Sequence, residues 1–411
     1  MKQSKSCIRH FSDLGIRDKL LEILKKQNFL VPTPIQHQVI PDALYGKDIV
    51  GIAQTGTGKT LAFIIPMIQR IIKSNGQGLI LVPTRELAFQ IEQVIRKISS
   101  PLRFYCAIVI GGASRYAQIS SLKRNPHIVV ATPGRLVDLI NQRAYNLNQV
   151  DVIVLDEADR MLDIGFLPQI KKILEFAPKE RQTMLFSATM PKTISSLAAM
   201  FMKMPIRIEI APQGTLSENI EQEVFIVPKN NKMRLLDSIL QKYHKDKILI
   251  FSRTKYGAKR IASDIRNMNY TATEIHSNRS QSQRKTALDG FVNGRFRVLV
   301  ATDIASRGID VKDISLVINF DFPSSSEDYV HRIGRTGRVN CYGKAISFVT
   351  SSERSDIKKI ERLIRKSLPI LSLPILPPER KKSYNNEEKF PRKRNQGSFR
   401  RYRNNSRRRR R

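Results

Sequence analysis

Short apolar runs recur along this chain, and each is followed by a polar or glycine-containing turn and a helix-like segment. Six of the runs lie in the first half, at residues 49–53, 79–82, 105–110, 128–131, 152–155 and 184–186. Four more follow at residues 248–251, 298–301, 316–319 and 345–349. The runs lack the alternation of apolar and polar residues that marks a strand with one solvated face. They are typical of parallel strands covered on both faces, so the sequence predicts an α/β fold.

A polar stretch rich in turn-forming residues separates the two series of runs. It has the sequence APQGTLSEN at residues 211–219 and is typical of a linker. We therefore predict a first domain over residues 1–210, a linker over 211–219 and a second domain over 220–370. Towards the end of the chain hydrophobic residues become rare, and Arg, Asn and Ser dominate. Such a segment buries too little apolar surface to offset its ordering entropy, so we expect residues 371–411 to form a disordered basic tail.

The net charge indicates a polyanionic partner. The 411 residues include 71 Lys and Arg against 36 Asp and Glu, a formal charge of +35. Residues 379–411 carry 15 basic and 3 acidic side chains, so +23 of this charge belongs to the rest of the chain. A charge of this size favours nucleic acid, and less strongly an anionic membrane surface. The chain is otherwise of globular composition, with 41% hydrophobic residues, which excludes fibrous and wholly disordered classes.

Several other classes are excluded by what the sequence lacks. Its three cysteines, Cys7, Cys106 and Cys341, are far apart and have no histidine at metal-ligand spacing, so neither a disulfide framework nor a zinc site is predicted. The first residues lack the apolar core of a secretory signal. The longest apolar stretch, at residues 61–72, is too short and too polar to span a bilayer. We expect a cytoplasmic protein with no membrane association.

A glycine-rich loop follows the first apolar run and precedes a helix-like segment. It consists of Ala53, Gln54, Thr55, Gly56, Thr57, Gly58, Lys59 and Thr60. The two glycines let the backbone point several N–H groups at one anion, and the helix start adds the positive end of its dipole. Lys59 is then placed to reach the β- and γ-phosphates of a nucleoside triphosphate, and the Thr60 hydroxyl to bind Mg²⁺. The strict pattern of a phosphate-binding loop has Gly in place of Ala53. The alternative to a phosphate site is a glycine turn before an ordinary helix.

Three carboxylates cluster at the end of the apolar run 152–155. They belong to Asp156, Glu157 and Asp159, and ionised carboxylates at the end of a buried strand are costly without compensation. Mg²⁺ would compensate them, held by Asp156, partly through water, opposite Thr60. Glu157 could then orient and deprotonate an attacking water. The alternative is an acidic N-cap of the next helix, a role that Asp159 alone could fill.

With these residues and several further motifs, the chain resembles the DEAD-box RNA helicases. Residues 156–159 spell DEAD, and the resemblance extends from Phe11 to about residue 365. The other matching motifs are PTPIQ at 32–36, PTREL at 83–87, GG at 111–112, TPGR at 132–135, SAT at 187–189, LIFS at 249–252, QSQR at 281–284, ATDIASRGID at 301–310 and HRIGRTGR at 331–338. In this family Ala is usual at position 53. The resemblance implies two RecA-like domains in tandem, and the compact core and Arg-rich tail are similar to the bacterial RhlE-type subgroup.

For ATP binding, the resemblance adds three residues to the phosphate loop. Gln36 would contact the N6 and N7 edge of adenine, Phe11 would stack on the ring, and Asp310 would contact the ribose. Without the resemblance, the segment 32–34 is better interpreted as a turn before a helix, and Phe11 as a core aromatic residue.

For hydrolysis, the resemblance implies that the second domain contributes two arginines. Arg335 and Arg338 would reach across to the γ-phosphate and act with Lys59, Asp156 and Glu157, so that hydrolysis requires the domains to close. Such arginine fingers are worth ~10³–10⁵ in rate. An Arg-rich glycine turn could otherwise be only a solvated loop.

Four residues would couple the nucleotide to the rest of the molecule. By resemblance, His331 links the nucleotide to the domain interface, while Ser187 and Thr189, which could bridge to Asp159, couple hydrolysis to strand separation. An ordinary strand-end turn is the alternative for the SAT segment.

RNA would lie across both domains beside the nucleotide cleft. By resemblance, its sugar–phosphate backbone contacts Arg85, Gly112, Thr132, Gly134 and Arg135 of the first domain and Arg284, Thr302 and Asp303 of the second. Backbone contacts of this kind fix the position of the RNA without reading its sequence, and the 2′-OH distinguishes RNA from DNA. The basic tail is either a nonspecific RNA tether, which we favour, or an aid to solubility.

The sequence therefore predicts an ATP-dependent RNA helicase that unwinds or remodels short duplexes and ribonucleoproteins without processivity. A first alternative is an ATP-gated RNA clamp or chaperone, and a second is a DNA translocase. We expect a monomeric bacterial protein, and ribosomal-precursor or RNA-decay complexes as its surroundings.

Overall fold

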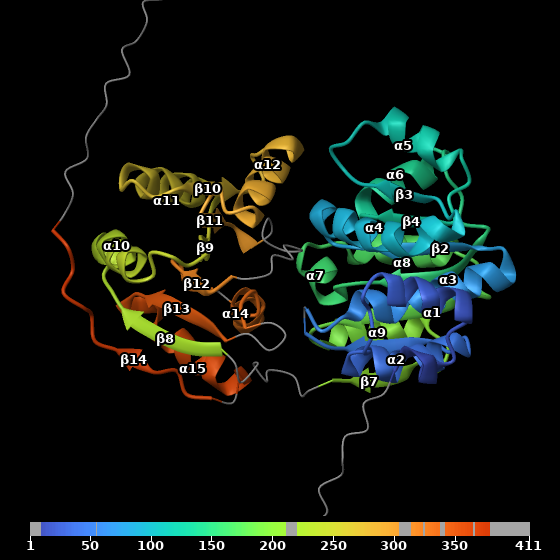
Figure 1. The fold of residues 1–411 in the computed structure, drawn as a ribbon, viewed down its shortest axis with the longest axis horizontal. Helices are drawn as coiled ribbons and strands as arrows, with labels where there is room; N and C mark the ends of the chain where they lie inside the picture. The colour runs from blue at the N-terminus through green and yellow to red at the C-terminus, as the bar shows by residue number, and fades with distance from the viewer. Residues whose placement is uncertain are drawn as a thin grey trace, which may run out of the picture.

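Two parallel sheets form the described part of the protein. The computed structural model describes residues 10–54, 56–210, 220–303, 314–323, 325–337, 342–364 and 366–378. Each sheet has seven strands, and all of their strand pairs are parallel. One sheet precedes the predicted linker and the other follows it (Figure 1). The predicted fold class, two parallel-sheet α/β domains in tandem, is thus confirmed. The linker 211–219 and residues 379–411 of the predicted tail lie outside the described residues.

The first sheet has the spatial order β3-β4-β2-β5-β6-β1-β7. Its strands are β1 (Ile49–Ile52), β2 (Gln77–Leu81), β3 (Cys106–Val109), β4 (Ile128–Ala131), β5 (Val150–Leu155), β6 (Gln182–Ser187) and β7 (Ile206–Glu209). Because β6 alone separates β1 from β5, the loops after these three strands meet at one edge of the sheet. Ligands of open parallel sheets bind outside this carboxyl edge.

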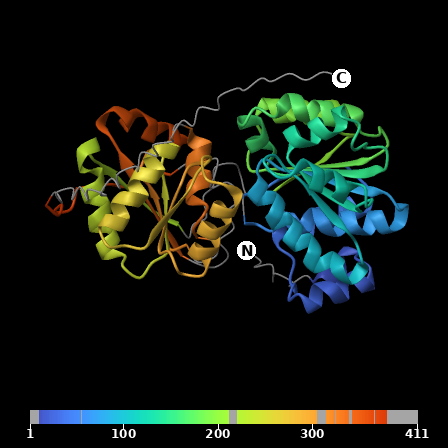
Figure 2. The same cartoon turned by 90° about the horizontal axis from the view of Figure 1, so that it is seen from above.

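Helices cover both faces of the first sheet (Figure 2). They are η1 (Phe11–Leu14), α1 (Asp18–Lys26), α2 (Pro34–Leu44), α3 (Lys59–Ser74), α4 (Arg85–Ser99), η2 (Ser100–Leu102), α5 (Arg115–Leu122), α6 (Pro133–Asn141), α7 (Ala158–Asp163), α8 (Leu167–Phe176) and α9 (Lys192–Phe201). The helices α1 to α4 pack against one face and α5 to α9 against the other. Alternate residues of each strand point to opposite faces, so strands with apolar residues at every position have both faces buried.

The second sheet has the order β10-β11-β9-β12-β13-β8-β14. Its strands are β8 (Ile220–Ile226), β9 (Ile248–Phe251), β10 (Ala272–Ile275), β11 (Val298–Ala301), β12 (Leu316–Asn319), β13 (Gly343–Val349) and β14 (Ile370–Leu371). The described helices of this domain are η3 (Lys229–Asn231), α10 (Lys232–Lys242), α11 (Lys255–Asn267), α12 (Gln281–Val292), α14 (Ser326–Ile333), η4 (Ser351–Glu353) and α15 (Arg354–Ile364). One face packs against α10 and α11, and the other against α12, α14 and α15.

Four strands, β7, β8, β10 and β14, were absent from the sequence prediction. β8 carries two glutamates, Glu221 and Glu223, that interrupt the apolar pattern. Both are paired with Lys344 on the neighbouring strand β13, at 3.1 and 2.6 Å. A strand near the edge of a sheet accommodates such pairs between exposed or half-exposed side chains, which conceals it from a search for continuous apolar runs.

The packed part of the second domain continues past residue 370, where the sequence predicted its end. The strand β14 pairs with β8, and Leu376 packs against the core. The Arg234 guanidinium fastens the segment by donating to the Pro377 carbonyl at 2.7 Å. The segment 371–378 therefore contacts the domain through Leu376 and the Pro377 carbonyl, whereas Leu371 and Leu373 are exposed.

None of the helices in the described ranges is long and apolar enough to cross a membrane.

Candidate functional site

The glycine-rich loop joins the carboxyl end of β1 to α3. Gly56 and Gly58 have φ angles of +85° and +93°, a left-handed conformation that glycine adopts without a steric penalty. Lys59 begins α3, and its ammonium donates to the Ala53 carbonyl at 2.7 Å. Thr60 is the second residue of the same helix and is partly exposed. The loop thus has the turns and the cation that a phosphate site requires.

Internal contacts and a contact from α2 hold this loop in place. Thr57 Oγ1 donates to the Gln54 carbonyl at 2.7 Å. From α2, the Gln36 amide donates through Nε2 to the Gly58 carbonyl at 2.9 Å. A Cβ atom at Gly58 would lie 2.5 Å from that nitrogen, so the close approach depends on glycine. Thr55 lies outside the described residues.

The two residues predicted to bind adenine have other contacts in this structure. Gln36 Oε1 accepts a hydrogen bond from the Thr33 N–H at 2.9 Å, which closes a capping box at the start of α2. Phe11 is 4% exposed and belongs to the hydrophobic core. These contacts match the alternative interpretation, in which Gln36 belongs to a helix start and Phe11 is a core aromatic residue. The adenine contact of the two residues stays a prediction.

The acidic cluster follows β5, two strands away from the phosphate loop. Asp156 is buried, and its Oδ1 accepts from the Glu157 N–H at 3.0 Å. Burial raises the pKa of Asp156 to about 7, although the Lys59 ammonium opposes the shift. Glu157 has a positive φ of 52°, and such backbone strain clusters at functional sites. A buried carboxyl group beside a lysine and a phosphate loop is well suited to a divalent cation.

Arg160 is a site residue that the sequence analysis missed. Its side chain is 1% exposed, and Nη1 lies 3.1 Å from Glu157 Oε2. Burial acts to raise the pKa of Glu157, but Arg160, Arg335 and Lys59 outweigh it and hold the pKa below its ordinary value. The protein itself therefore supplies a buried cation to this cluster, in addition to the Mg²⁺ that the sequence predicted, which stays a prediction. The i,i+3 spacing between Glu157, which directly precedes α7, and Arg160 within that helix was the available signal.

The SAT segment at the end of β6 is bonded to the acidic cluster. Asp159 Oδ2 accepts from the Thr189 N–H at 2.9 Å and from Thr189 Oγ1 at 3.0 Å. In the other direction, the Asp159 N–H donates to Ser187 Oγ at 3.3 Å. These are the bridges that the sequence suggested, so this segment is more than an ordinary strand-end turn.

The arginine turn of the second domain faces this cluster. His331 Nε2 lies 4.0 Å from Asp159 Oδ2. Arg335 is 4% exposed and is close enough to Glu157 to lower the pKa of that carboxyl group. The described residues of this turn, 331–337, are therefore largely buried beside the first domain and do not form a solvated loop. Arg338 and Asp310 lie outside the described residues.

The predicted RNA contacts of the first domain gather around the glycine pair. The guanidinium of Arg85, the first residue of α4, lies against Gly112, where a Cβ atom would collide with it. Arg135 Nη1 donates to the Ala113 carbonyl at 3.2 Å. The other two predicted contacts, Thr132 and Gly134, lie at the start of α6. The structure thus brings these residues of distant sequence to one place.

The predicted RNA contacts of the second domain are already engaged in ion pairs or lie at a strand end. Arg284 Nη2 is 3.0 Å from Glu86 Oε2 of the first domain. Both carboxylate oxygens of Asp303 accept from Arg332, at 2.6 and 2.8 Å. Thr302 directly follows β11 and is partly exposed. The sequence analysis assigned no role to Glu86 or Arg332.

Within the described residues, no group of three or more His, Cys, Asp and Glu side chains could hold a metal ion. Mg²⁺ sites commonly use one or two protein groups together with water and phosphate oxygens. The chemistry of Asp156 and Thr60 fits such a site.

Two protein-family models match the chain. The model for DEAD/DEAH box helicases covers residues 33–197, and the model for the helicase conserved C-terminal domain covers residues 231–340. The first match includes the phosphate loop and the acidic cluster, and the second includes the arginine turn.

Two similar proteins align along most of their length. The DEAD-box ATP-dependent RNA helicase CshA of Bacillus cereus is 41% identical over 368 residues, which are 89% of this chain and 70% of the relative. The ATP-dependent rRNA helicase RRP3 of Yarrowia lipolytica is 40% identical over 370 residues, which are 89% of this chain and 77% of that protein.

Solved structures of one relative resemble both domains together. S. cerevisiae Dbp5 bound to RNA and ADP BeF3 has a TM-score of 0.81 at 27% identity, covering 88% of this chain and 95% of that one. Dbp5 bound to gle1 and IP6 has a TM-score of 0.72 at 28% identity, covering 89% and 96%. By TM-score, the chain is thus more similar to the Dbp5 structure with RNA and ADP BeF3.

Proposed function

The chain belongs to the DEAD-box family of ATP-dependent RNA helicases, and on that premise we propose how its residues divide the work. Its activity is ATP-dependent RNA helicase activity, which couples RNA-stimulated ATP hydrolysis to changes in RNA structure. The finer proposal is that the unwinding is local and non-processive, and acts on short duplexes and ribonucleoproteins.

In this proposal the first domain binds the phosphates and adenine of ATP, and the second domain contacts the ribose through Asp310. The loop from Ala53 to Thr60 receives the phosphates, with Lys59 beside the β- and γ-phosphates. Gln36 and Phe11 select adenine, and Asp310 contacts the ribose. Mg²⁺, held by Thr60 and by Asp156 partly through water, would neutralise phosphate charge. The support is the left-handed glycine turns, the buried lysine and the raised pKa of the Asp156 carboxyl group.

Hydrolysis is shared between the domains. Glu157 orients the attacking water and accepts its proton, and Arg160 keeps that carboxylate ionised and in position. Arg335 and Arg338 offset the charge that develops on the γ-phosphate. The observation that carries this proposal is the burial of Arg335 beside Glu157, across the interface between the domains.

Coupling and RNA binding use the remaining residues. Asp159, Ser187 and Thr189 pass the state of the nucleotide to His331 at the interface. RNA lies along Arg85, Gly112, Thr132, Gly134 and Arg135 of the first domain and Arg284, Thr302 and Asp303 of the second. The RNA is held by its sugar–phosphate backbone, so the two domains have little preference for its sequence.

A strand-displacement assay beside an ATPase assay tests the function. We expect a short RNA duplex to be separated, and RNA to stimulate hydrolysis where DNA of the same sequence does not. Turnover without displacement would favour the ATP-gated RNA clamp. Equal stimulation by DNA would favour a DNA translocase.

The basic segment 379–411 is proposed as a nonspecific RNA tether. Each phosphate contact contributes about −0.7 to the slope of log K against log salt on single strands. Deleting 379–411 should flatten this slope and raise the KM for RNA while basal ATPase remains. An unchanged slope would favour a role in solubility.

The cellular setting is proposed from the relatives. CshA is a bacterial protein, and RRP3 is described as an rRNA helicase. We infer a cytoplasmic, monomeric bacterial helicase, similar to the RhlE-type subgroup, that works on ribosomal precursors or in RNA decay. Sequencing RNA crosslinked to the protein in cells would identify the substrate and would distinguish these two settings.

A further inference from the structure

The two sheets have the same construction, strand by strand. The order β3-β4-β2-β5-β6-β1-β7 of the first becomes β10-β11-β9-β12-β13-β8-β14 in the second, with each strand advanced by seven. β8 therefore takes the place of β1, which precedes the phosphate loop, and β12 takes the place of β5, which precedes the acidic cluster. This equivalence identifies the residues of the second domain that lie at the positions of the triphosphate site of the first.

A buried lysine stands at the same place in both domains. Lys59 is the first residue of α3, the first α-helix after β1, and Lys232 is the first residue of α10, the first α-helix after β8. The two are 6% and 5% exposed. The Lys59 ammonium donates to the Ala53 carbonyl at 2.7 Å, and the Lys232 ammonium donates to the Phe320 carbonyl at 2.8 Å.

A carboxylate also stands at the matching strand end. In the first sheet the Asp156 N–H donates to the last residue of β2, and in the second the Phe320 N–H donates to the last residue of β9. By this register Phe320 corresponds to Asp156, and Asp321 corresponds to Glu157. Asp321 Oδ1 lies 3.8 Å from Lys232 Nζ.

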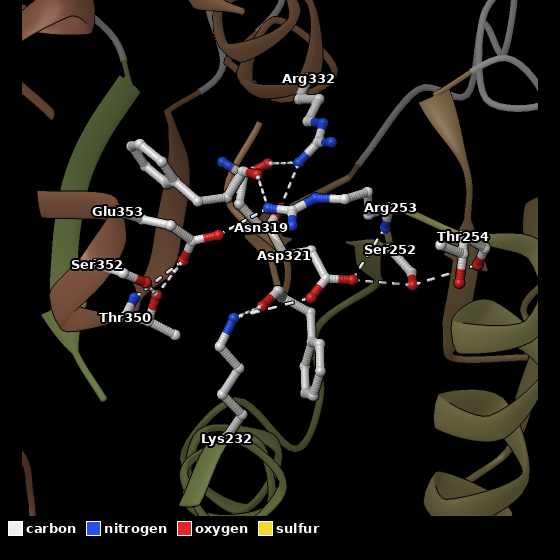
Figure 3. A network of polar contacts seen from close by, with 12 residues as sticks. Lys232, Ser252, Arg253, Thr254, Asn319, Asp321, Arg332, Thr350, Ser352 and Glu353 are labelled. Atoms are coloured by element: carbon white, nitrogen blue, oxygen red, sulfur yellow. Dashed lines mark hydrogen bonds and ion pairs between the residues drawn. The ribbon is translucent and has the colours of Figure 1, made fainter. Parts of the chain in front are cut away.

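The site in the second domain differs because its own side chains fill it. The segment 227–231, which replaces the phosphate loop, contains no glycine and no residue with positive φ. Its backbone therefore lacks the left-handed turns of Gly56 and Gly58. Asp321 Oδ2 accepts from Ser252 Oγ at 3.1 Å and from the Arg253 N–H at 2.9 Å. Figure 3 shows the carboxylate enclosed by these groups.

Arg332 contacts the same end of β12 from the side opposite to Lys232. Arg332 Nη1 donates to the Asp321 carbonyl at 2.7 Å and to Asn319 Oδ1 at 3.2 Å. In Figure 3, Lys232 and Arg332 reach the end of β12 from opposite directions. The Arg335 N–H in turn donates to the Arg332 carbonyl at 3.2 Å. An unbroken series of contacts thus leads from Lys232 through residues 320–321 and Arg332 to Arg335.

We propose that Lys232 and Asp321 are a closed counterpart of the triphosphate site, and that they position Arg335 for hydrolysis instead of binding a nucleotide. The pair fixes the end of β12, the strand end fixes Arg332, and Arg332 fixes the arginine turn. This inference rests on the proposed role of Arg335 towards the γ-phosphate.

The test compares Lys232→Met with Lys242→Met, a change to an exposed lysine at the other end of the same helix. Misplacement of a reacting group by about 1 Å costs up to ~10²-fold. We expect Lys232→Met to lower the RNA-stimulated kcat per folded molecule by ~10- to 100-fold. The affinity for a fluorescent ADP should be unchanged, since Lys232 is none of the residues proposed to contact the nucleotide. Lys232→Arg should recover part of the rate, and Lys242→Met should be normal.

A double-mutant cycle separates positioning from general damage. If Lys232 acts through Arg335, Lys232→Met should cost little in an Arg335→Ala background, because the residue it positions is already absent. Equal losses in both backgrounds, or a normal kcat for Lys232→Met, would overturn the inference. A normal kcat for Arg335→Ala alone would instead refute the proposed function.

Folding is a second concern, because Lys232→Met leaves the partly exposed Asp321 carboxylate, 28% exposed, without its nearby cation. The double variant Lys232→Met with Asp321→Asn removes both charges and keeps the volume of the site. If it is folded by circular dichroism, it should show the same loss of kcat, and a normal kcat in this folded variant would also overturn the inference.

Discussion

Arg284 on α12 and Glu86 on α4 form an ion pair of 3.0 Å that joins the second domain to the first. Each side chain is 14% exposed. Glu86 directly follows Arg85, so the pair lies on the face predicted for RNA. Removing one member of a largely buried pair leaves the other charge unpaired, which makes the closed arrangement sensitive to either residue.

Replacing Glu86 by Lys should hold the domains apart, because like charges facing each other cost several kcal/mol. We expect the RNA-stimulated kcat to fall by about tenfold or more, with ADP binding unchanged. Energy transfer between dyes on the two domains, measured with RNA and an ATP analogue, would report the loss of closure. The charge swap Glu86→Lys with Arg284→Glu restores an ion pair but removes the RNA contact proposed for Arg284, so it should recover closure in part. Normal closure in the single variant would contradict this role.

Gly58→Ala should impair the phosphate loop through a collision as well as through backbone strain. The new Cβ atom would lie 2.5 Å from Gln36 Nε2 and 2.8 Å from Thr33 Oγ1. Gly165→Ala is the matched control, since Gly165 also has a positive φ, of 87°, but has no atom within 4 Å of the added carbon. Strain alone costs about 1–3 kcal/mol. ATP affinity, measured by calorimetry, should therefore fall in the first variant and stay normal in the second.

The role of Gln36 can be separated into two parts. Its side chain supports the phosphate loop through Gly58, and the family resemblance predicts an adenine contact as well. If both hold, Gln36→Ala should weaken ATP binding more than GTP binding. An equal loss for the two nucleotides would mean that Gln36 acts only through the loop. Binding of each nucleotide to the folded variant is the measurement.

Glu157→Gln should bind ATP and RNA but hydrolyse ATP very slowly, because an amide cannot accept the proton of the attacking water. The side chain keeps its size, and Arg160 loses its anionic partner. We expect a single-turnover rate lower by at least ~10². Near-normal turnover would show that another group positions the water.

Glu274 offers a pH-dependent test of the second domain away from the nucleotide. Burial acts to raise the pKa of Glu274, but hydrogen bonds from Arg266 and Arg279 outweigh it and hold the pKa below 4.5. A lowered pKa stabilises the folded state above the unfolded value, and this contribution is lost as the pH falls through the folded value. The difference in unfolding free energy between the wild type and Glu274→Gln should thus be largest near neutral pH and shrink below about 4.5. A difference that does not change with pH would assign the effect to packing.

Much of the fold could be predicted because central parallel strands are apolar on both faces. The strands β4, β9, β11 and β12 have the bounds that the sequence suggested. β10 was missed because Glu274 breaks its apolar run, and only the two arginines packed around it make that residue tolerable. Their positions follow from the tertiary structure and not from local pattern.

In the site, too, some residues could be predicted from local sequence and others depend on the tertiary structure. The phosphate loop and the acidic cluster are local in sequence and chemically distinctive, so they could be identified from the residues alone. Glu86 and Lys232 could not, because each is an ordinary helical residue whose partner is distant in sequence. Ion pairs of this kind depend on how the elements pack, and the composition of either segment gives no sign of them.

Two of the contacts that join the domains within the described residues lie at separate places. His331 meets Asp159 beside the phosphate loop, and Arg284 meets Glu86 on the face predicted for RNA. Closure of the two domains would therefore depend on ATP at the first place and on RNA at the second, and both ligands would be needed at once. With ATP alone the two domains would stay open, so the cell would not lose ATP to hydrolysis in the absence of RNA.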